Sequence, residues 1–409
     1  MMGPVLIVTP RWTRDGGVAT HVMTSAAALV AHGVEVHVLA AQIAPEERAP
    51  GITFHQSPDL FNREATPQRR VGAAMERLPH IVHFHQFEDP DVACHMQRSA
   101  PVIVSVHGYS ACTSAVHYFR PGEECERPHG PGCVPNLIGR GCAHTRNPSW
   151  LPGSYRRATR SVRLLGQADL VISYSSVIDR HLSTNGIERR AIVPLFSTLP
   201  QAGASGHEHR RRVVFAGRVV RPKGVQVLVR AACELDAEVV ICGDGRDLDS
   251  MRSLAARLGL GERISFPGWL TADALAAELA GASVVAIPSL WPEPFGLVGI
   301  ETLAQGRPVI ASATGGIGDW LEDGVGGLLA APGDVPALAA ALNELLADPE
   351  RQRAMGAAGR ERVASRFTAA HHVAALLGAF DAARTGWERR QPPLTTRRSS
   401  VPITGATLG

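Results

Sequence analysis

Long apolar runs are missing from this sequence, and so is any large excess of one charge. Its longest apolar stretches have the length of a strand and fall short of the roughly 18 residues that cross a membrane. Lysine and arginine together number 41 against 38 acidic residues. The resulting net charge of +3 is too small to indicate nucleic-acid binding. These absences argue against a membrane-spanning protein and against a nucleic-acid-binding one.

A secretion signal is also missing, and the cysteines do not form an even set. Residues 1–4 carry no charged n-region, and the apolar run Val5–Val8 is too short for an h-region. Seven cysteines is an odd number in a chain that shows no export signal. We therefore expect reduced cysteines and a cytoplasmic location.

Short apolar segments, each followed by a turn and a helix-like segment, recur along the 409 residues. Their length and their Val and Ile content are typical of buried parallel strands. A first set comprises 5–9, 35–41, 80–85, 101–107, 169–175 and 191–195. A second set comprises 212–217, 238–243, 263–268, 283–289, 308–312 and 326–330. Two sets predict two doubly wound, Rossmann-like α/β domains.

Composition sets the expected domain boundaries. They are 1–200 for an N-terminal domain, 201–212 for a polar linker, 213–384 for a C-terminal domain with closing helices, and 385–409 for a tail. The tail has few apolar residues, which predicts disorder. Residues 108–150 contain no clear strand or helix. A structureless segment this long is either functional or held by its own cross-links.

Glycines and cations follow several predicted strands, where open α/β sheets bind ligands. Gly16 and Gly17 open a helix and would let backbone N–H groups approach an anion or a sugar, although such a pair can also be a simple tight turn. Arg218 and Lys223 share one loop, where they suit a diphosphate or are solvated surface cations. The next strand ends in glycines against which a ligand could lie: Gly243 and Gly245.

The segment 288–312 carries the most specific motif. Glu293 precedes a helix that begins near residue 297, and Glu301 follows eight residues later. Backbone N–H groups at the start of this helix would face a phosphate. Glu301 can reach ribose hydroxyls, since a carboxylate accepts two hydroxyl protons at once. The donor-binding residues predicted around the helix start are Phe295, Gly296, Leu297 and Val298.

The order of these motifs resembles the retaining glycosyltransferases of family 4, whose GT-B fold has two Rossmann-like domains facing a central cleft. The resemblance covers residues 3–383. The roles that it implies are diphosphate binding by Arg218 and Lys223, ribose binding by Glu301, and contacts to the donor sugar by Glu293 and His107. Asp319 stands where the family usually has Glu, which leaves that contact open.

The resemblance implies transfer of a sugar, with retention, from a nucleotide diphosphate sugar to a hydroxyl acceptor. The acceptor would belong to polysaccharide, glycoconjugate or natural-product biosynthesis. No metal or other cofactor would be required for catalysis, and peripheral membrane contact stays open. Two alternatives are a nucleotide-sugar epimerase of the same architecture and a non-catalytic nucleotide-sugar-binding protein.

Histidines and cysteines raise the question of a metal. His83 and His85 lie two residues apart on a predicted strand, so they share one face. We favour a role as polar side chains on the acceptor side over a metal site there. Four cysteines fall within the segment 108–150: Cys112, Cys125, Cys133 and Cys142. Their spacing contains no Cys-x2-Cys knuckle. Packed thiols, a structural zinc site and two disulfides are the alternatives for this cluster.

Overall fold

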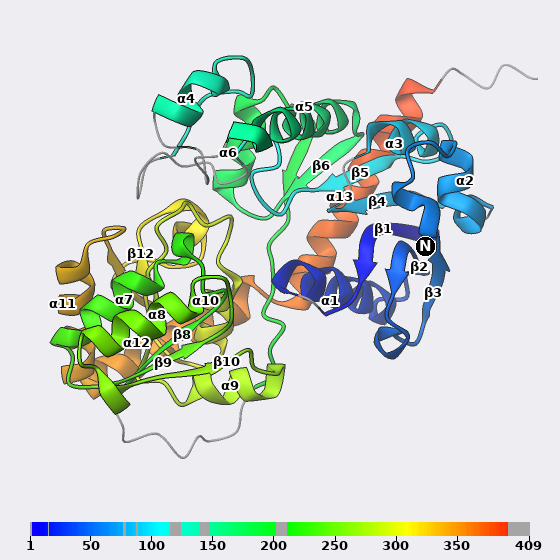
Figure 1. Ribbon diagram of the computed structural model, residues 1–409. Helices are drawn as coiled ribbons and strands as arrows, with labels where there is room; N and C mark the ends of the chain where they lie inside the picture. The colour runs from blue at the N-terminus through cyan, green and yellow to red at the C-terminus, as the bar shows by residue number, and fades with distance from the viewer. Residues whose placement is uncertain are drawn as a thin grey trace, which may run out of the picture.

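A computed structural model describes residues 2–14, 16–76, 79–86, 89–114, 124–139, 142, 148–201 and 211–391. It contains two α/β lobes, each built on one parallel sheet (Figure 1). The first sheet has the order β3-β2-β1-β4-β5-β6-β7 and the second the order β10-β9-β8-β11-β12-β13. The predicted pair of doubly wound domains is confirmed.

The strands of the first sheet are β1 (Val5–Trp12), β2 (Val36–Ile43), β3 (Ile52–Gln56), β4 (Ile81–His85), β5 (Val102–Ser105), β6 (Leu170–Ser173) and β7 (Arg190–Ile192). Those of the second are β8 (Arg212–Ala216), β9 (Glu238–Cys242), β10 (Ile264–Gly268), β11 (Val284–Ile287), β12 (Val309–Ser312) and β13 (Gly327–Ala330). The inner strands are buried because helices cover both faces, which explains their Val and Ile content. The sequence prediction missed β3, a half-exposed strand at the sheet edge.

The helices of the N-terminal lobe are α1 (Gly17–Ala31), α2 (Pro67–Val71), α3 (Pro90–Met96), α4 (Cys133–Gly139), α5 (Leu151–Gln167) and α6 (Ser176–Thr184). Those that follow are α7 (Val225–Ala231), α8 (Leu248–Arg257), α9 (Ala272–Ala280), α10 (Leu297–Ala304), α11 (Val335–Ala347), α12 (Pro349–Arg366) and α13 (Ala369–Arg390). The expectation that 108–150 holds no helix was wrong, because α4 lies within it.

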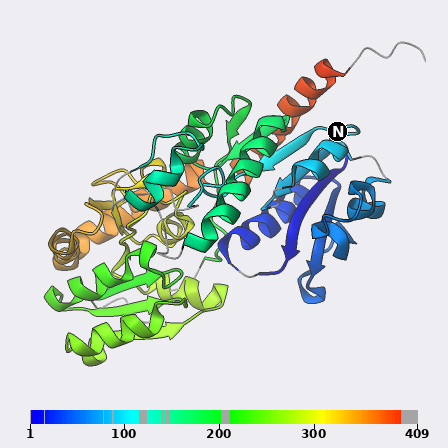
Figure 2. The ribbon, with the colours of Figure 1, turned by 45° about the horizontal axis from the view of Figure 1, so that its top comes forward.

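The last helix returns to the first lobe. α13 packs against α1, β5 and β6, and both ribbon views show it running along the N-terminal sheet (Figures 1 and 2). It ends at Arg390, so residues 385–390, predicted to belong to a disordered tail, are helical. The rest of that tail and residues 202–210 of the predicted linker lie outside the described residues.

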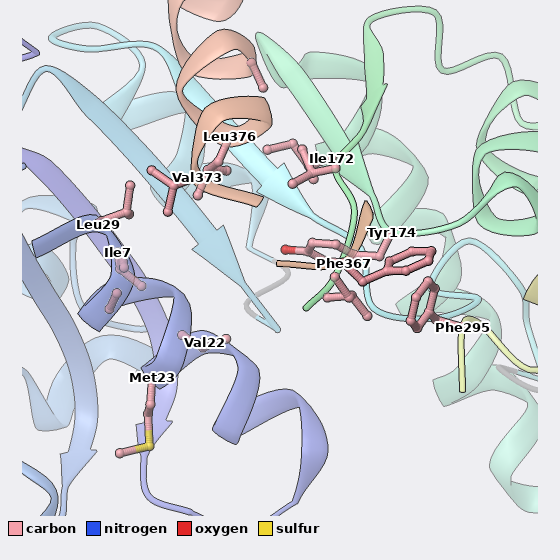
Figure 3. Close-up of a cluster of buried hydrophobic side chains, with 14 of the residues drawn as sticks. Ile7, Val22, Met23, Leu29, Ile172, Tyr174, Phe295, Phe367, Val373 and Leu376 are labelled. Carbon is pink, nitrogen blue, oxygen red and sulfur yellow. The ribbon is translucent and has the colours of Figure 1, made fainter. Parts of the chain in front are cut away.

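One apolar cluster joins the two lobes. It contains Val373 and Leu376 of α13 together with Tyr174, Phe295 and Phe367. Figure 3 shows the rings of Tyr174, Phe367 and Phe295 beside one another, although Tyr174 follows β6 and Phe295 precedes α10. This shared core packs residues of the two lobes against each other.

Candidate active site

The loops that follow β8 and β11 pack against each other at the carboxyl ends of their strands. The amide of Leu290 donates to the carbonyl of Pro222 at 2.8 Å. A Cβ on Gly224, whose φ is 71°, would lie 1.7 Å from the carbonyl oxygen of Pro288, so only glycine permits this approach. The contact brings Lys223 against the loop that carries the first acidic residue of the motif.

Lys223 is paired with Glu293 in this structure. Its Nζ lies 2.8 Å from Oε1 and 2.9 Å from Oε2 of Glu293, and the hydroxyl of Ser289 donates to Oε1 at 2.5 Å. The Glu293 side chain is 2% exposed and that of Lys223 is 22% exposed. Because a buried carboxylate needs a cation and hydrogen-bond donors, Lys223 and Ser289 stabilise its charge. The ammonium remains the more accessible member of the pair.

The remaining predicted residues of the β8 and β9 loops take different places. Arg218 is exposed in the same loop as Lys223. A Cβ on Gly243 would lie 1.8 Å from the carbonyl oxygen of Gly217, and one on Gly245 would lie 2.4 Å from that of Val219. We expected these glycines to admit a ligand. In the structure their backbones pack against the loop that follows β8, so this close packing by itself requires glycine at both positions.

The N-terminus of α10 follows Gly296, whose φ is 86°. The first N–H groups of a helix have no acceptor within it, so this terminus offers donors to an anion beside half-buried Leu297 and Val298. Phe295 was predicted to bind the donor, but its ring is 5% exposed and lies 5.9 Å from that of Phe367. Its side chain therefore belongs to the apolar core, and a contact between Phe295 and the donor stays a prediction.

Glu301 lies in α10 and is 7% exposed. The hydroxyl of Thr198 donates to its Oε1 at 2.9 Å. Burial raises the pKa of Glu301 to about 7 and outweighs the opposing effect of that hydrogen bond. Its carboxyl is therefore only partly ionised at neutral pH, and additional hydroxyl donors would favour the carboxylate.

His107 and the first helix supply the N-terminal side of the site. Nε2 of His107 lies 3.0 Å from Nδ1 of His85, and its ring stacks on Tyr174 at a centroid distance of 4.9 Å. Burial lowers the pKa of His107 to about 3, so the ring is neutral at pH 7. A Cβ on Gly16 or Gly17 would meet nothing within 4 Å, so the start of α1 is open.

The other two strand-end histidines do not lie on an accessible surface. His83 and His85 share one face, as predicted, with ring centroids 4.1 Å apart. Both are 2% exposed, so they lie in the protein interior behind His107. The expectation that they provide polar side chains to the acceptor was wrong. In the described part of the chain, no three His, Cys, Asp or Glu side chains are placed to share a metal ion.

Two polar contacts that the sequence did not predict connect the lobes. The hydroxyl of Tyr109 donates to the carbonyl of Pro292 at 3.0 Å. The Asp319 carboxylate accepts from the backbone N–H of Ser176 at 2.7 Å and from its hydroxyl at 2.6 Å. Tyr109 lies two residues after His107, so these contacts place the predicted sugar-binding loops of both lobes side by side.

We expect Asp319→Ala to lower kcat/KM about 10-fold, because hydrogen bonds to a charged group contribute about 1.5–3 kcal/mol and here they hold two lobes together. Small-angle X-ray scattering should show a larger radius of gyration. Asp334→Ala is the matched control, since Asp334 caps α11 within one lobe. Equal kinetics and equal scattering for the two variants would contradict a role in closure.

The four clustered cysteines line a single cavity. Cys112, Cys125, Cys133 and Cys142 surround it together with His129. Burial and mutual repulsion raise the pKa of Cys125, and they raise that of Cys142 to about 12. All seven cysteines of the chain are free thiols in this structure, so the disulfide alternative is not the arrangement seen.

Comparisons with known proteins agree with this architecture. A family model described as Glycosyl transferases group 1 matches residues 202–362, and one described as Glycosyltransferase Family 4 matches residues 15–195. The chain is 27% identical over 390 residues to D-inositol 3-phosphate glycosyltransferase of Arthrobacter. The match covers 88% of this chain and 90% of that protein.

Two solved structures share the fold. Sucrose-phosphate synthase from Thermosynechococcus elongatus superposes with a TM-score of 0.72 at 22% identity, covering 95% of this chain and 100% of that chain. HepE of Anabaena, solved with UDP and glucose, gives a TM-score of 0.67 at 17% identity, covering 92% and 100%. Within the described ranges, no helix has the length and apolar character that a bilayer crossing requires.

Proposed function

Since the chain is a group 1 glycosyltransferase with the GT-B fold, we propose that it transfers a sugar, with retention, from a nucleotide diphosphate sugar to a hydroxyl acceptor of polysaccharide, glycoconjugate or natural-product biosynthesis. The observation that carries this proposal is the Lys223–Glu293 pair, which lies beside the α10 N-terminus and next to the loop of His107. The matched families support a transferase rather than an epimerase or a non-catalytic binding protein.

Each end of the donor has a matching group. An ammonium has three N–H donors, so Lys223 can keep its contact with Glu293 while it binds the diphosphate. Arg218 and the first N–H groups of α10 would add further donors. Glu301 would accept from ribose hydroxyls, and Glu293 and His107 would contact the sugar.

The proposed step exchanges one bond at the anomeric carbon. The bond to the diphosphate oxygen breaks while the acceptor oxygen forms a bond on the same face. The acceptor proton passes to a departing diphosphate oxygen, so atoms and charge balance without a covalent enzyme intermediate. The protein positions the two substrates and stabilises the leaving charge.

Two assays test the function. Thermal-shift screening against UDP-, GDP- and ADP-sugars should identify the donor, since a ligand at 100 times its Kd adds about 2.7 kcal/mol of stability. Labelled donor, incubated alone and then with candidate hydroxyl acceptors, should give a labelled glycoside only when an acceptor is present. Interconversion of the sugar without an acceptor would instead indicate an epimerase.

We further propose that the cysteine-lined cavity binds structural zinc. Four thiols converge there, and a divalent cation would offset the repulsion and desolvation that disfavour their thiolates. Because no three of them have ligating geometry in this structure, the thiols would have to close around the ion. Binding would release protons and cross-link the cysteines of the segment that follows His107. The free thiols fit the reducing cytoplasmic location that the sequence predicts.

Metal analysis of untagged protein, purified without chelators, should find about one zinc per chain. Cys125→Ser with Cys133→Ser should abolish it, while Cys233→Ser, at an exposed cysteine outside the cavity, should not. Removal of zinc should impair acceptor use more than donor binding. A zinc content below about 0.1 per chain, with all seven thiols titrating after unfolding, would contradict the proposal.

A further inference from the structure

A chain of hydrogen bonds runs through the interior of the N-terminal lobe and ends at His107. The hydroxyl of Tyr174 lies 2.8 Å from Oγ of Ser105, which lies 2.8 Å from Nε2 of His83. Nδ1 of His83 is 3.3 Å from Nε2 of His85, and Nδ1 of His85 is 3.0 Å from Nε2 of His107. Both nitrogens of His83 and of His85 are used in this chain. Among the described residues, Nδ1 of His107 is the one ring nitrogen of these three histidines without a hydrogen-bond partner.

The sheet topology creates this chain from three neighbouring strands. His85 of β4 lies directly opposite Ser105 of β5, and Tyr174 follows β6, the next strand. Side chains two apart on a strand share a face, so His83 stands behind His85 on the same side of the sheet. The hydrogen bonds therefore lead from the middle of the sheet to its carboxyl end, where His107 lies.

Tyr174 fixes the direction of the chain. Tyr174 is 5% exposed, and within the described residues the only hydrogen-bond partner of its hydroxyl is Ser105. If the phenol accepted from Ser105, its own O–H would be buried without a partner, which is strongly unfavourable. The phenol therefore donates to Oγ of Ser105, and the Ser105 hydroxyl donates to Nε2 of His83.

The donor-to-acceptor direction of the hydrogen bonds continues through each histidine because the imidazole rings are neutral. Burial lowers the pKa of His83 and of His107 to about 3 and holds that of His85 well below its ordinary value. A neutral imidazole has one N–H and one acceptor nitrogen. Since His83 accepts at Nε2, it donates from Nδ1. His85 then accepts at Nε2 and donates from Nδ1 to His107.

We propose that Tyr174, Ser105, His83 and His85 are positioning residues that hold His107 in the neutral tautomer with its proton on Nδ1. His107 then presents a hydrogen-bond donor, and not an acceptor, to an oxygen of the donor sugar. This inference rests on the sugar contact proposed for His107. Two further histidines of this core lie outside the hydrogen-bond chain. Neither ring nitrogen of His21 has a hydrogen-bond partner among the described residues, and His372 bonds to Ser25 and to the carbonyl of Pro194.

The tautomer can be measured directly on the unmodified enzyme. Two-bond ¹⁵N–¹H correlation spectra of histidine-labelled protein at pH 7 should show a protonated Nδ1 and an unprotonated Nε2 for His107, assigned by the peaks lost in His107→Ala. Tyr174→Phe keeps the stacked ring but removes the phenol, and should mix the tautomers. His372→Asn is the matched control and should leave the His107 peaks unchanged. A proton on Nε2 of wild-type His107 would overturn the proposal.

Activity gives a second, separate readout. His85→Leu should lower kcat about 10-fold, since it removes one hydrogen bond to a group near the reacting centre. His85→Asn should restore most of that loss, because its amide nitrogen stands near the position of Nδ1 and can donate to His107. Equal losses in both variants would indicate packing alone. If His107→Ala keeps full activity while the spectra show Nδ1–H, the proposed sugar contact fails and the tautomer assignment stands.

Discussion

Lys223→Ala is expected to lower kcat about 100-fold or more, by analogy with the removal of one donor from an oxyanion site. The negative charge on the leaving diphosphate grows in the transition state. Loss of the Lys223 ammonium should therefore affect turnover more than donor KM. The same substitution leaves the Glu293 carboxylate, which is 2% exposed, without its cation. Breaking a fully buried pair costs about 3–5 kcal/mol of stability, and we expect less here because Lys223 is partly exposed.

The two consequences can be separated by a double variant. Lys223→Ala with Glu293→Gln removes both charges, so it should recover thermal stability while turnover stays low. Recovery of turnover together with stability would mean that Lys223 serves only to neutralise Glu293. Near-wild-type turnover in Lys223→Ala alone would contradict the diphosphate contact outright.

Chemical modification offers an independent check, because Lys223 is the only lysine in the chain. An amine-selective acylating reagent can react only with this side chain and with the N-terminal amine. Bound nucleotide sugar should slow the acylation of Lys223, followed by mass spectrometry, and leave that of the N-terminus unchanged. Unaltered acylation of both amines at saturating donor would place the diphosphate elsewhere.

The sequence predicted the architecture well because buried parallel strands have a strong local pattern. Every apolar segment that was identified overlaps a strand of the structure. The missed strand, β3, lies at an edge and alternates between partly buried and exposed residues, so it lacks a continuous apolar run. The helical residues 385–390 were missed because their support comes from α13 packing on the other lobe. Tertiary packing of this kind leaves little trace in local composition.

The candidate site was predictable as a set of positions but not as a set of contacts. The Glu293 and Glu301 motif and the Lys223 loop could be identified from their places after strands. Their pairing depends on the contact of Gly224 with the β11 loop, many residues away. Likewise, the alternation of His83 and His85 was visible, but not that β5 and β6 would bring Ser105 and Tyr174 beside them. Strand order, which the apolar pattern does not contain, decides such contacts.

Glu301→Gln should stabilise the protein at alkaline pH and weaken donor binding. Burial raises the folded-state pKa of Glu301 from 4.5 to about 7, so between these values the folded state holds a proton that the unfolded state has released. Stability is therefore full below pH 4.5, falls as pH rises to about 7, and stays reduced above it. Glutamine does not ionise and avoids this loss. The gain at pH 8 should reach about 3 kcal/mol at most and vanish near pH 4.

Donor binding should respond to pH in the opposite direction. Ribose hydroxyls donate best to the ionised carboxylate, so the wild-type affinity for a nucleotide sugar should rise as pH increases through about 7. Glu301→Gln should lower that affinity about 10–100-fold at pH 8, because it loses charge-assisted hydrogen bonds, and should abolish this pH dependence.

Glu322→Gln, at an exposed glutamate on the same lobe, is the matched control for both measurements. Calorimetric unfolding and donor titrations at pH 4 to 8 would test the pair of effects. If wild type and Glu301→Gln have parallel stability profiles, Glu301 is ionised throughout, and the partly protonated carboxyl inferred from its burial does not exist.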